Sequence, residues 1–177
     1  MSRLLTLVFA GILALTLVPA SHAGLGVGAR YSYVHNNGLE DNSSMIGVMV
    51  RLRHMMILGL EGAIDHRREE MNNGSKLNST PLTASLMVYP VPFVYGLAGV
   101  GLYRTSIETN SGAEASDSQI GYHYGAGVEM PLLPLLKLTG DIRYQFIDYE
   151  FEDIPGSLGK VDANGYAVSA GVIFYLK

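Results

Sequence analysis

Strict alternation of apolar and polar residues is the strongest pattern in this chain, and it is clearest between Gln119 and Phe151. In Tyr122–Met130 and Lys137–Phe146, every second residue is apolar or aromatic, and the residues between are mostly small or charged. A period of two is typical of a β-strand with two chemically different faces. A turn containing Pro131 and Pro134 separates the two segments, so they are predicted to form a hairpin. What the polar face of that hairpin meets decides the class of protein.

The same alternation recurs along the chain after the first two dozen residues. We find eight segments of roughly ten residues that show it, and none with helical periodicity. The sequence therefore predicts an all-β fold with eight antiparallel strands. The predicted strands are Gly24–His35, Met45–Arg53, Ile57–His66, Leu82–Tyr89, Phe93–Thr105, Tyr122–Met130, Lys137–Phe146 and Ala163–Leu176.

The connections between these strands alternate in length and composition. Polar connections are predicted at Asn36–Ser43, Arg67–Thr80, Ser106–Ser118 and Asp148–Val161. The three connections between them are short and contain Met or Pro. In an up-and-down sheet this asymmetry places every long loop at one end. We therefore predict a closed barrel with four long loops on one side.

The first 23 residues have a different character. Arg3 precedes the apolar run Leu4–Val18, and Ser21-His22-Ala23 has the small-x-small pattern of a cleavage site. This arrangement predicts a secretory signal peptide at residues 1–23, because the apolar run is too short for a spanning helix. The remaining residues, 24–177, are predicted to form one domain.

Composition narrows the function classes. The chain of 177 residues is 48% hydrophobic, only 16% charged, and has a net charge of −4. The negative balance and the lack of a basic arm argue against nucleic-acid binding. The chain has no cysteine, so neither disulfides nor an acylated cysteine anchor contributes. An exported, cysteine-free and rather apolar protein is expected.

Alternation alone does not separate a soluble barrel with an apolar interior from a transmembrane barrel with a polar one. The polar faces of the predicted strands hold many glycines and few long charged side chains. A water-facing surface would be rich in Lys and Glu, whereas a narrow lumen has room for small residues around a few charges. We therefore predict a transmembrane barrel, in which closure removes the strand edges that hydrocarbon does not tolerate.

The charged residues on the polar faces nearly balance in sign. In a confined lumen an unpaired charge is costly, so these side chains are expected to form ion pairs and hydrogen bonds. Tyrosines on the opposite face are expected in the interfacial belts of the membrane. The predicted lumen network consists of Arg30, Arg51, Arg53, Glu61, Asp65, Glu129, Lys137, Asp141 and Arg143. The predicted belt residues are Tyr31, Tyr33, Tyr122, Tyr124, Tyr144 and Tyr166.

Two stretches carry a family resemblance. Tyr124–Leu132 followed by Leu138–Tyr144 resembles the sixth and seventh strands of the OmpA-like family of outer-membrane β-barrels, which includes opacity-type porin relatives. Pro92–Tyr103 is similar to that family's fifth strand. The resemblance covers the whole predicted barrel, and it indicates fold far better than function.

The resemblance implies an integral protein of a Gram-negative-type outer membrane, with long loops outside and both termini periplasmic. Its implied partners are outer-membrane lipid or lipopolysaccharide and the barrel-assembly machinery, with a possible surface ligand at the loops. Lys177 departs from the aromatic last residue usual in the family, which the assembly machinery reads. No peptidoglycan-binding domain follows the barrel, so anchoring to the cell wall is not implied.

The expected function is a structural, adhesive or surface-interaction role, with a narrow pore for small solutes or ions as the alternative. A lipid-modifying enzyme is the second alternative. It is disfavoured, because His123 has no recognisable nucleophile motif beside it and the His-x-Ser-Asn run of the lipid A deacylases is missing. No cofactor or metal site is expected, since the acidic loop after Asp148 lacks EF-hand spacing.

Overall fold

The structure is a computed structural model that describes residues 23–36, 43–54, 57–70, 76–108, 114–149, 161–162 and 164–176. Within these residues every regular element is a β-strand. Eight long strands form the body of the protein, and two short ones pair beside it. The strands are β1 (Ala23–Asn36), β2 (Ser43–His54), β3 (Leu58–Glu70), β4 (Lys76–Val91), β5 (Val94–Glu108), β6 (Glu114–Pro131), β7 (Leu136–Phe146), β8 (Asp148–Tyr149), β9 (Val161–Asp162) and β10 (Gly165–Leu176).

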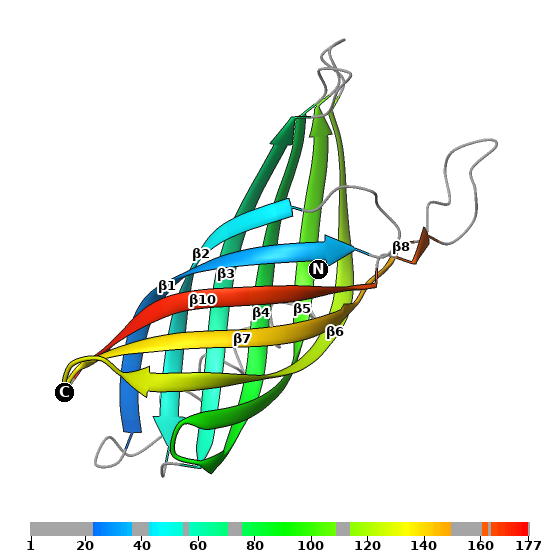
Figure 1. The fold of residues 1–177 in the computed structure, drawn as a ribbon. Coiled ribbons are helices and arrows are strands. Elements are labelled where there is room, and N and C mark those ends of the chain that lie inside the picture. The colour runs from blue at the N-terminus through cyan, green and yellow to red at the C-terminus, as the bar shows by residue number, and fades with distance from the viewer. Residues whose placement is uncertain are drawn as a thin grey trace.

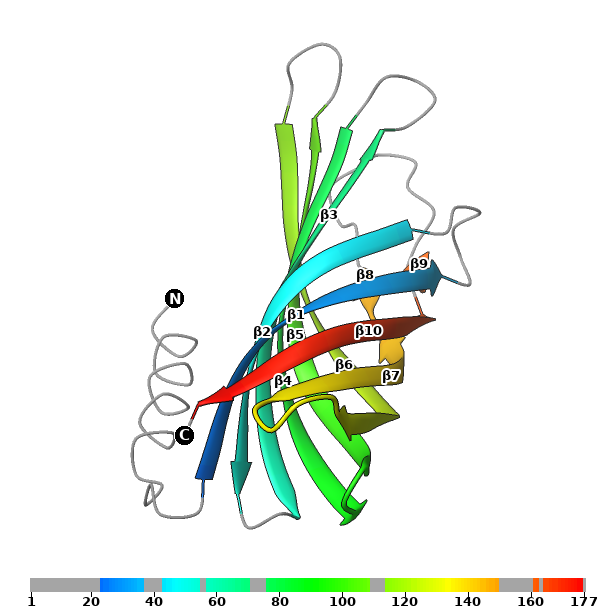
Figure 2. The same ribbon diagram turned by 60° about the vertical axis from the view of Figure 1, so that its left-hand side comes forward.

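The eight long strands close into a barrel in the order β1-β10-β7-β6-β5-β4-β3-β2 (Figures 1 and 2). All neighbours are antiparallel, and closure occurs where β1 meets β10, with Leu25 opposite Leu176. The barrel therefore has no free edge along the wall that all eight strands share. The predicted eight-stranded antiparallel up-and-down barrel is confirmed.

The two faces of the wall differ as the alternation predicts. In β2 the side chains are alternately buried and exposed, with Ile46 67% exposed and Arg51 fully buried. Most large apolar side chains on the other strands point outward, but some, such as Met87, Leu97 and Ile173, are buried on the inner face. The predicted belt tyrosines also lie on the outer face, five of them exposed and Tyr144 partly exposed. The wall is thus apolar outside, while the inner face holds the charged side chains together with a few apolar ones, which is the arrangement of a barrel in lipid.

Two hairpins extend well beyond the rest of the barrel. Figures 1 and 2 show β3–β4 and β5–β6 rising together past the ends of β1, β2, β7 and β10. We call this side the hairpin end. The opposite side is the short-turn end. It carries the turns at 92–93 and 132–135, the start of β1 at Ala23 and the end of β10 at Leu176.

The projecting part corrects two sequence predictions. The stretches predicted as polar loops at Arg67–Thr80 and Ser106–Ser118 are largely strand, because β3 pairs with β4 as far as Glu70 and Lys76. Likewise, β5 pairs with β6 as far as Glu108 and Glu114. Beyond the membrane both faces of a strand meet water, so the apolar alternation that reveals a strand disappears. Backbone pairing continues without it.

The region after β7 also differs from a plain loop. Asp148 pairs with Asp162 and Tyr149 with Val161, so β8 and β9 form a short ladder of their own. Residues 150–160 of the predicted acidic loop lie outside the described residues. The same is true of residues 1–22, so the signal peptide and its boundary stay a prediction. No helix in the described ranges is long and apolar enough to cross a membrane.

Candidate functional site

The charged side chains of the inner wall form the candidate site. The structure places all nine predicted lumen residues on the inner face and in one network of ion pairs. Seven of them are almost fully buried. Arg53 and Lys137 are the two exceptions, with side chains 14% and 24% exposed near the short-turn end. The predicted residues are therefore brought together without exception.

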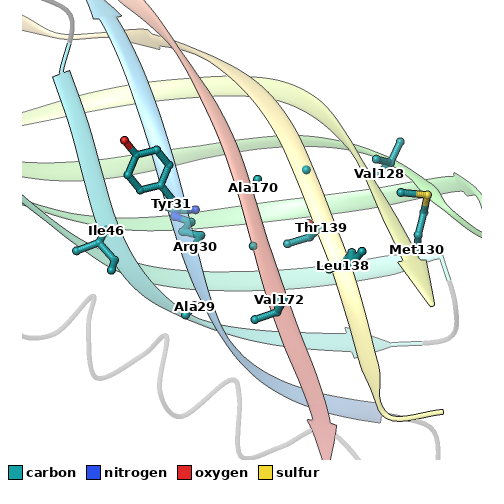
Figure 3. A pocket seen from close by; sticks show the side chains of 12 residues that line it. Ala29, Arg30, Tyr31, Ile46, Val128, Met130, Leu138, Thr139, Ala170 and Val172 are labelled. Carbon is teal, nitrogen blue, oxygen red and sulfur yellow. The ribbon is translucent and has the colours of Figure 1, made fainter. Parts of the chain in front are cut away.

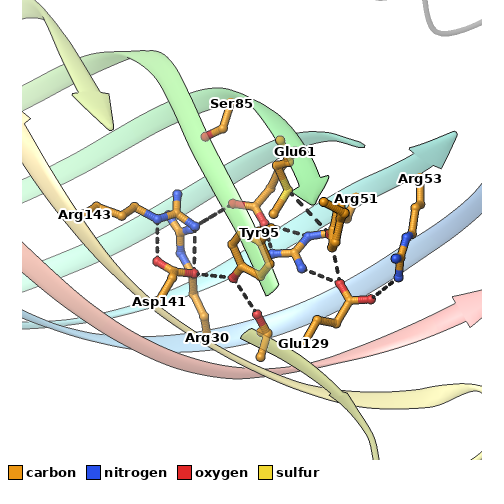
Figure 4. A network of polar contacts seen from close by, with 12 residues as sticks. Arg30, Arg51, Arg53, Glu61, Ser85, Tyr95, Glu129, Asp141 and Arg143 are labelled. Atoms are coloured by element: carbon orange, nitrogen blue, oxygen red, sulfur yellow. Dashed lines mark hydrogen bonds and ion pairs between the residues drawn. The ribbon is translucent and has the colours of Figure 1, made fainter. Parts of the chain in front are cut away.

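Arg51 links two carboxylates and crosses the barrel. Its Nη1 lies 2.6 Å from Oε2 of Glu129, and its Nε lies 3.0 Å from Oε2 of Glu61, which also accepts from Nη2 (Figure 4). β2 and β6 lie four positions apart in the closed order of eight strands, so the Arg51–Glu129 pair joins opposite walls. Planar guanidinium groups suit such multiple contacts, because their donors are fixed in one fork.

A second ion pair also spans the lumen. Nη2 of Arg143 on β7 lies 2.8 Å from Oε1 of Glu61 on β3, and these strands too are opposite each other. Arg143 is held in place by Asp141, whose Oδ1 accepts from its Nε at 2.6 Å. Arg30 completes this layer, with Nη2 2.5 Å from Oδ2 of Asp65 and Nη1 3.2 Å from Oε1 of Glu61. Two diametric pairs therefore lie within one connected layer of charge.

Glu129 is the acceptor on which the short-turn half of the network converges. Besides Arg51, it accepts from Nη1 of Arg53 at 3.0 Å and from Nζ of Lys137 at 2.7 Å. The hydroxyls of Tyr89 and Tyr175 donate to it at 3.2 and 3.1 Å. A carboxylate buried in a lumen needs such a set of donors, since an uncompensated charge there costs several kcal/mol.

The buried tyrosines also hold the cations by their ring faces. The guanidinium of Arg53 lies 4.1 Å from the ring centroid of Tyr89, and that of Arg51 lies 4.9 Å from Tyr95. The ammonium of Lys137 lies 4.5 Å from the ring of Tyr175. These distances fall within the range of cation–π attraction. Each of three cations therefore contacts both a carboxylate and an aromatic ring.

Glycines on the inner wall make room for these rings. A Cβ added at Gly127 would lie 2.5 Å from Cζ of Tyr95, and one added at Gly59 would lie 3.2 Å from Cε2 of Tyr89. At Gly101 the corresponding Cβ would lie 2.7 Å from Cε2 of Tyr103. The aromatic rings therefore pack directly against the backbone at these glycines. The glycines of the polar face make room for the rings and also suit a narrow lumen.

Sequence reasoning missed the aromatic half of this site. The network includes Tyr89, Tyr95, Tyr175 and Thr139, none of which was among the predicted residues. Tyr95 Oη donates to Oδ2 of Asp141 at 2.9 Å and lies 2.9 Å from Oγ1 of Thr139. The sequence does contain a signal, because Tyr89 has the same strand parity as Thr83 and Ser85, and Tyr175 the same parity as Ser169. The prediction assigns tyrosine only to the membrane belts and so omits the tyrosines of the lumen.

Ser85 and His123 form a separate buried pair. Oγ of Ser85 lies 2.8 Å from Nε2 of His123, while Nδ1 of His123 has no hydrogen-bond partner in the described part of the chain. A hydrolytic Ser–His pair needs a third group that orients the imidazole, usually through that second nitrogen. No such group is present among the described residues. Within the described part of the chain, the pair therefore lacks the arrangement of a catalytic triad.

A depression of about 580 Å³ lies on the outer surface instead (Figure 3). Its lining includes small residues, among them Ala29, Ala170 and Gly140, and larger ones such as Tyr31 and Met130. Ala29, Tyr31, Met130 and Ala170 are exposed on the outer, lipid-facing side of the wall. The described residues also hold no group of three or more His, Cys, Asp or Glu side chains that could bind a metal ion.

The geometry of a polar, tightly paired lumen inside an apolar wall agrees with a family match over almost the whole chain. Residues 4–174 match the family described as outer membrane protein beta-barrel domain. The chain belongs to this family. Membership confirms the OmpA-like resemblance and makes the protein an outer-membrane barrel. No curated protein matches the chain.

Several solved structures of outer-membrane proteins share this barrel fold. Neisserial surface protein A is 18% identical, with a TM-score of 0.60 and coverage of 89% of this chain and 99% of that chain. A major outer membrane protein from Thermus thermophilus is 15% identical, with a TM-score of 0.61 and coverage of 87% and 99%. Ail, the attachment invasion locus protein of Yersinia pestis, is 19% identical, with a TM-score of 0.53 and coverage of 88% and 98%. At these identities the similarity concerns the fold alone.

Proposed function

We propose that this outer-membrane barrel is a closed scaffold that holds its two projecting hairpins at the cell surface for a structural, adhesive or other surface-interaction role. The observation that carries this proposal is the presence of two ion pairs across the lumen, Arg51–Glu129 and Arg143–Glu61. They join opposite walls of a narrow eight-stranded barrel, where side chains already fill the interior. A barrel filled in this way serves as a support better than as a channel.

The hairpins supply the surface. β3–β4 and β5–β6 are neighbours in the barrel, so their projecting parts form one continuous four-stranded sheet above the membrane wall. We propose that this sheet faces outward from the cell, with both termini periplasmic, and that lipid or lipopolysaccharide surrounds the apolar wall. The assembly machinery would act on the chain during insertion. The name of Ail records a role in attachment for a barrel of the same fold.

Conductance of the refolded protein in a planar bilayer tests the closed lumen. We expect no steady current steps from the wild-type chain, with an open porin refolded in the same way as the positive control. The alternative, a narrow pore, predicts steps that Glu129→Ala or Arg143→Ala alters in size or in selectivity. Reproducible wild-type steps of that kind would replace the scaffold proposal with the pore.

Binding by whole cells tests the hairpins. A heparin-coated surface is a suitable probe, because Ail has been solved with the heparin analogue sucrose octasulfate. We expect cells that display the wild-type chain to bind more than cells that display a chain with residues 69–77 and 106–116 replaced by short turns. A chain with only residues 150–160 shortened is the matched control. Equal retention of all three would leave the scaffold without this adhesive role.

A further inference from the structure

Arg143 has one nitrogen that the charge network does not use. Its Nε and Nη2 donate to Asp141, and Nη2 also donates to Glu61, but Nη1 is buried without a hydrogen-bond partner in the described part of the chain. The residue is only 3% exposed. Figure 4 shows this nitrogen turned away from both carboxylates, on the side where Ser85 lies. A buried guanidinium donor without an acceptor carries a desolvation cost of about 1–3 kcal/mol or more.

His123 presents a second unused nitrogen on the neighbouring strand. It lies opposite Gln145 in the β6–β7 ladder, and Arg143 is two residues further along β7. Such diagonal neighbours on one face are about 7–8 Å apart at the backbone, within reach of long side chains. Gly125, which lies opposite Arg143, has no side chain to separate them. When the Ser85 hydroxyl donates a hydrogen bond to Nε2, the single ring proton of the neutral imidazole lies on Nδ1, which is then a donor.

The lumen network as a whole carries a surplus of positive charge. The lumen network holds five cations against four carboxylates, so one positive charge is left over among the described residues that form it. An excess charge in a low-dielectric interior is costly until a counterion offsets it.

We propose that Arg143 Nη1 and His123 Nδ1 bind a small monovalent anion, of the size and chemistry of a halide, inside the lumen. Two buried N–H donors on neighbouring strands suit a single-atom acceptor, and one negative charge cancels the surplus of the whole network. A divalent oxyanion would reverse the imbalance rather than remove it. The site does not depend on the surface role, because it neutralises the interior whether the barrel serves as a scaffold or conducts.

Exchange of chloride for gluconate at constant ionic strength tests the site in solution. The full chain, refolded in detergent, is unfolded with urea and followed by far-UV circular dichroism. Chloride at about ten times its dissociation constant should lower the unfolding equilibrium constant roughly tenfold relative to gluconate. His123→Phe should abolish this difference, while Ser32→Ala should retain it, because Ser32 bonds Ser169 instead of the site. A wild-type midpoint that is the same in both salts overturns the proposal.

Bromide anomalous diffraction locates the ion without any variant, so this test remains available if His123→Phe does not fold. Crystals of the wild-type chain grown in bromide should show a peak within hydrogen-bond distance of Arg143 Nη1 and His123 Nδ1. Chloride dependence with a peak elsewhere, or with none, overturns this site. A peak without chloride dependence in solution means binding at crystal concentration only, and also overturns it.

Discussion

Arg51 and Glu129 meet across the full width of the barrel, with Nη1 2.6 Å from Oε2 and both side chains buried. They belong to β2 and β6, which share no hydrogen-bonded edge. The barrel wall is closed by its backbone ladders alone, so this contact is not needed to form the sheet. Its effect is to tie opposite walls together and to fill the bore, which links the stability of the protein to the closure of its lumen.

Arg51→Met should be among the most destabilising single changes in the lumen. Removal of the guanidinium leaves the carboxylates of Glu61 and Glu129 buried with fewer donors, and breaking a buried pair in this way costs about 3–5 kcal/mol. Urea unfolding in detergent, followed by far-UV circular dichroism or by heat-modifiable gel migration, measures the loss. Arg53→Met is the matched control, because Arg53 is partly exposed and should cost clearly less. Equal losses for the two variants would contradict the central place given to Arg51.

The fold could be predicted from the sequence because the membrane imposes a two-faced pattern on every spanning strand. Residues such as Ile46 and Arg51 follow that rule, and their parity alone places one in lipid and the other in the lumen. This alternation is required only in the part of each strand that spans the membrane. Arg67 and Ser79 pair in the projecting part of β3 and β4 although the sequence there has the composition of a polar loop.

Only half of the site could be predicted, for a related reason. Charged residues on a lumen-facing parity are easily recognised, since lipid-facing positions rarely accept them. A lumen-facing tyrosine is harder to recognise, because the same side chain suits the membrane interface at Tyr33 and the lumen at Tyr175. A linear pattern also does not show which charge pairs with which. Glu61 and Arg143 are 82 residues apart, and only closure of the barrel brings their walls opposite each other.

Tyr175→Phe separates the hydrogen bond of this tyrosine from its packing. The ring can stay beside Gly24 and under Lys137, while the hydroxyl that donates to Glu129 at 3.1 Å is lost. A hydrogen bond to a charged acceptor contributes about 1.5–3 kcal/mol, so stability should fall by that order. Tyr33→Phe is the control, because Tyr33 lies on the outer face and should change the urea midpoint little. Similar midpoints for both variants would show that the Glu129 contact adds no stability.

Gly127→Ala tests the fit of ring to backbone. The new methyl group would lie 2.5 Å from Cζ of Tyr95 and 2.6 Å from the carbonyl oxygen of Gly140, so either the ring or the wall must move. Overpacking of this kind costs about 1–3 kcal/mol. Gly62→Ala is the matched control, since a Cβ there meets nothing within 4 Å. We expect that control to be neutral or slightly stabilising, because alanine is about 0.5–1 kcal/mol better than glycine inside a strand.

Cysteine labelling in intact cells tests which end of the barrel faces outward. The chain has no native cysteine, so single substitutions report without background. Thr80→Cys places a thiol at an exposed position in the projecting part of β4, and Leu133→Cys places one in the β6–β7 turn at the short-turn end, where Leu133 is 60% exposed. With a maleimide too large for outer-membrane pores, we expect Thr80→Cys to react in intact cells and Leu133→Cys to react only after the membrane is permeabilised. An even number of strands places both termini at the same end of the barrel. It does not say which side of the membrane that end faces, so the labelling decides the orientation. The reverse pattern would place the hairpins in the periplasm, where they have no access to a surface partner.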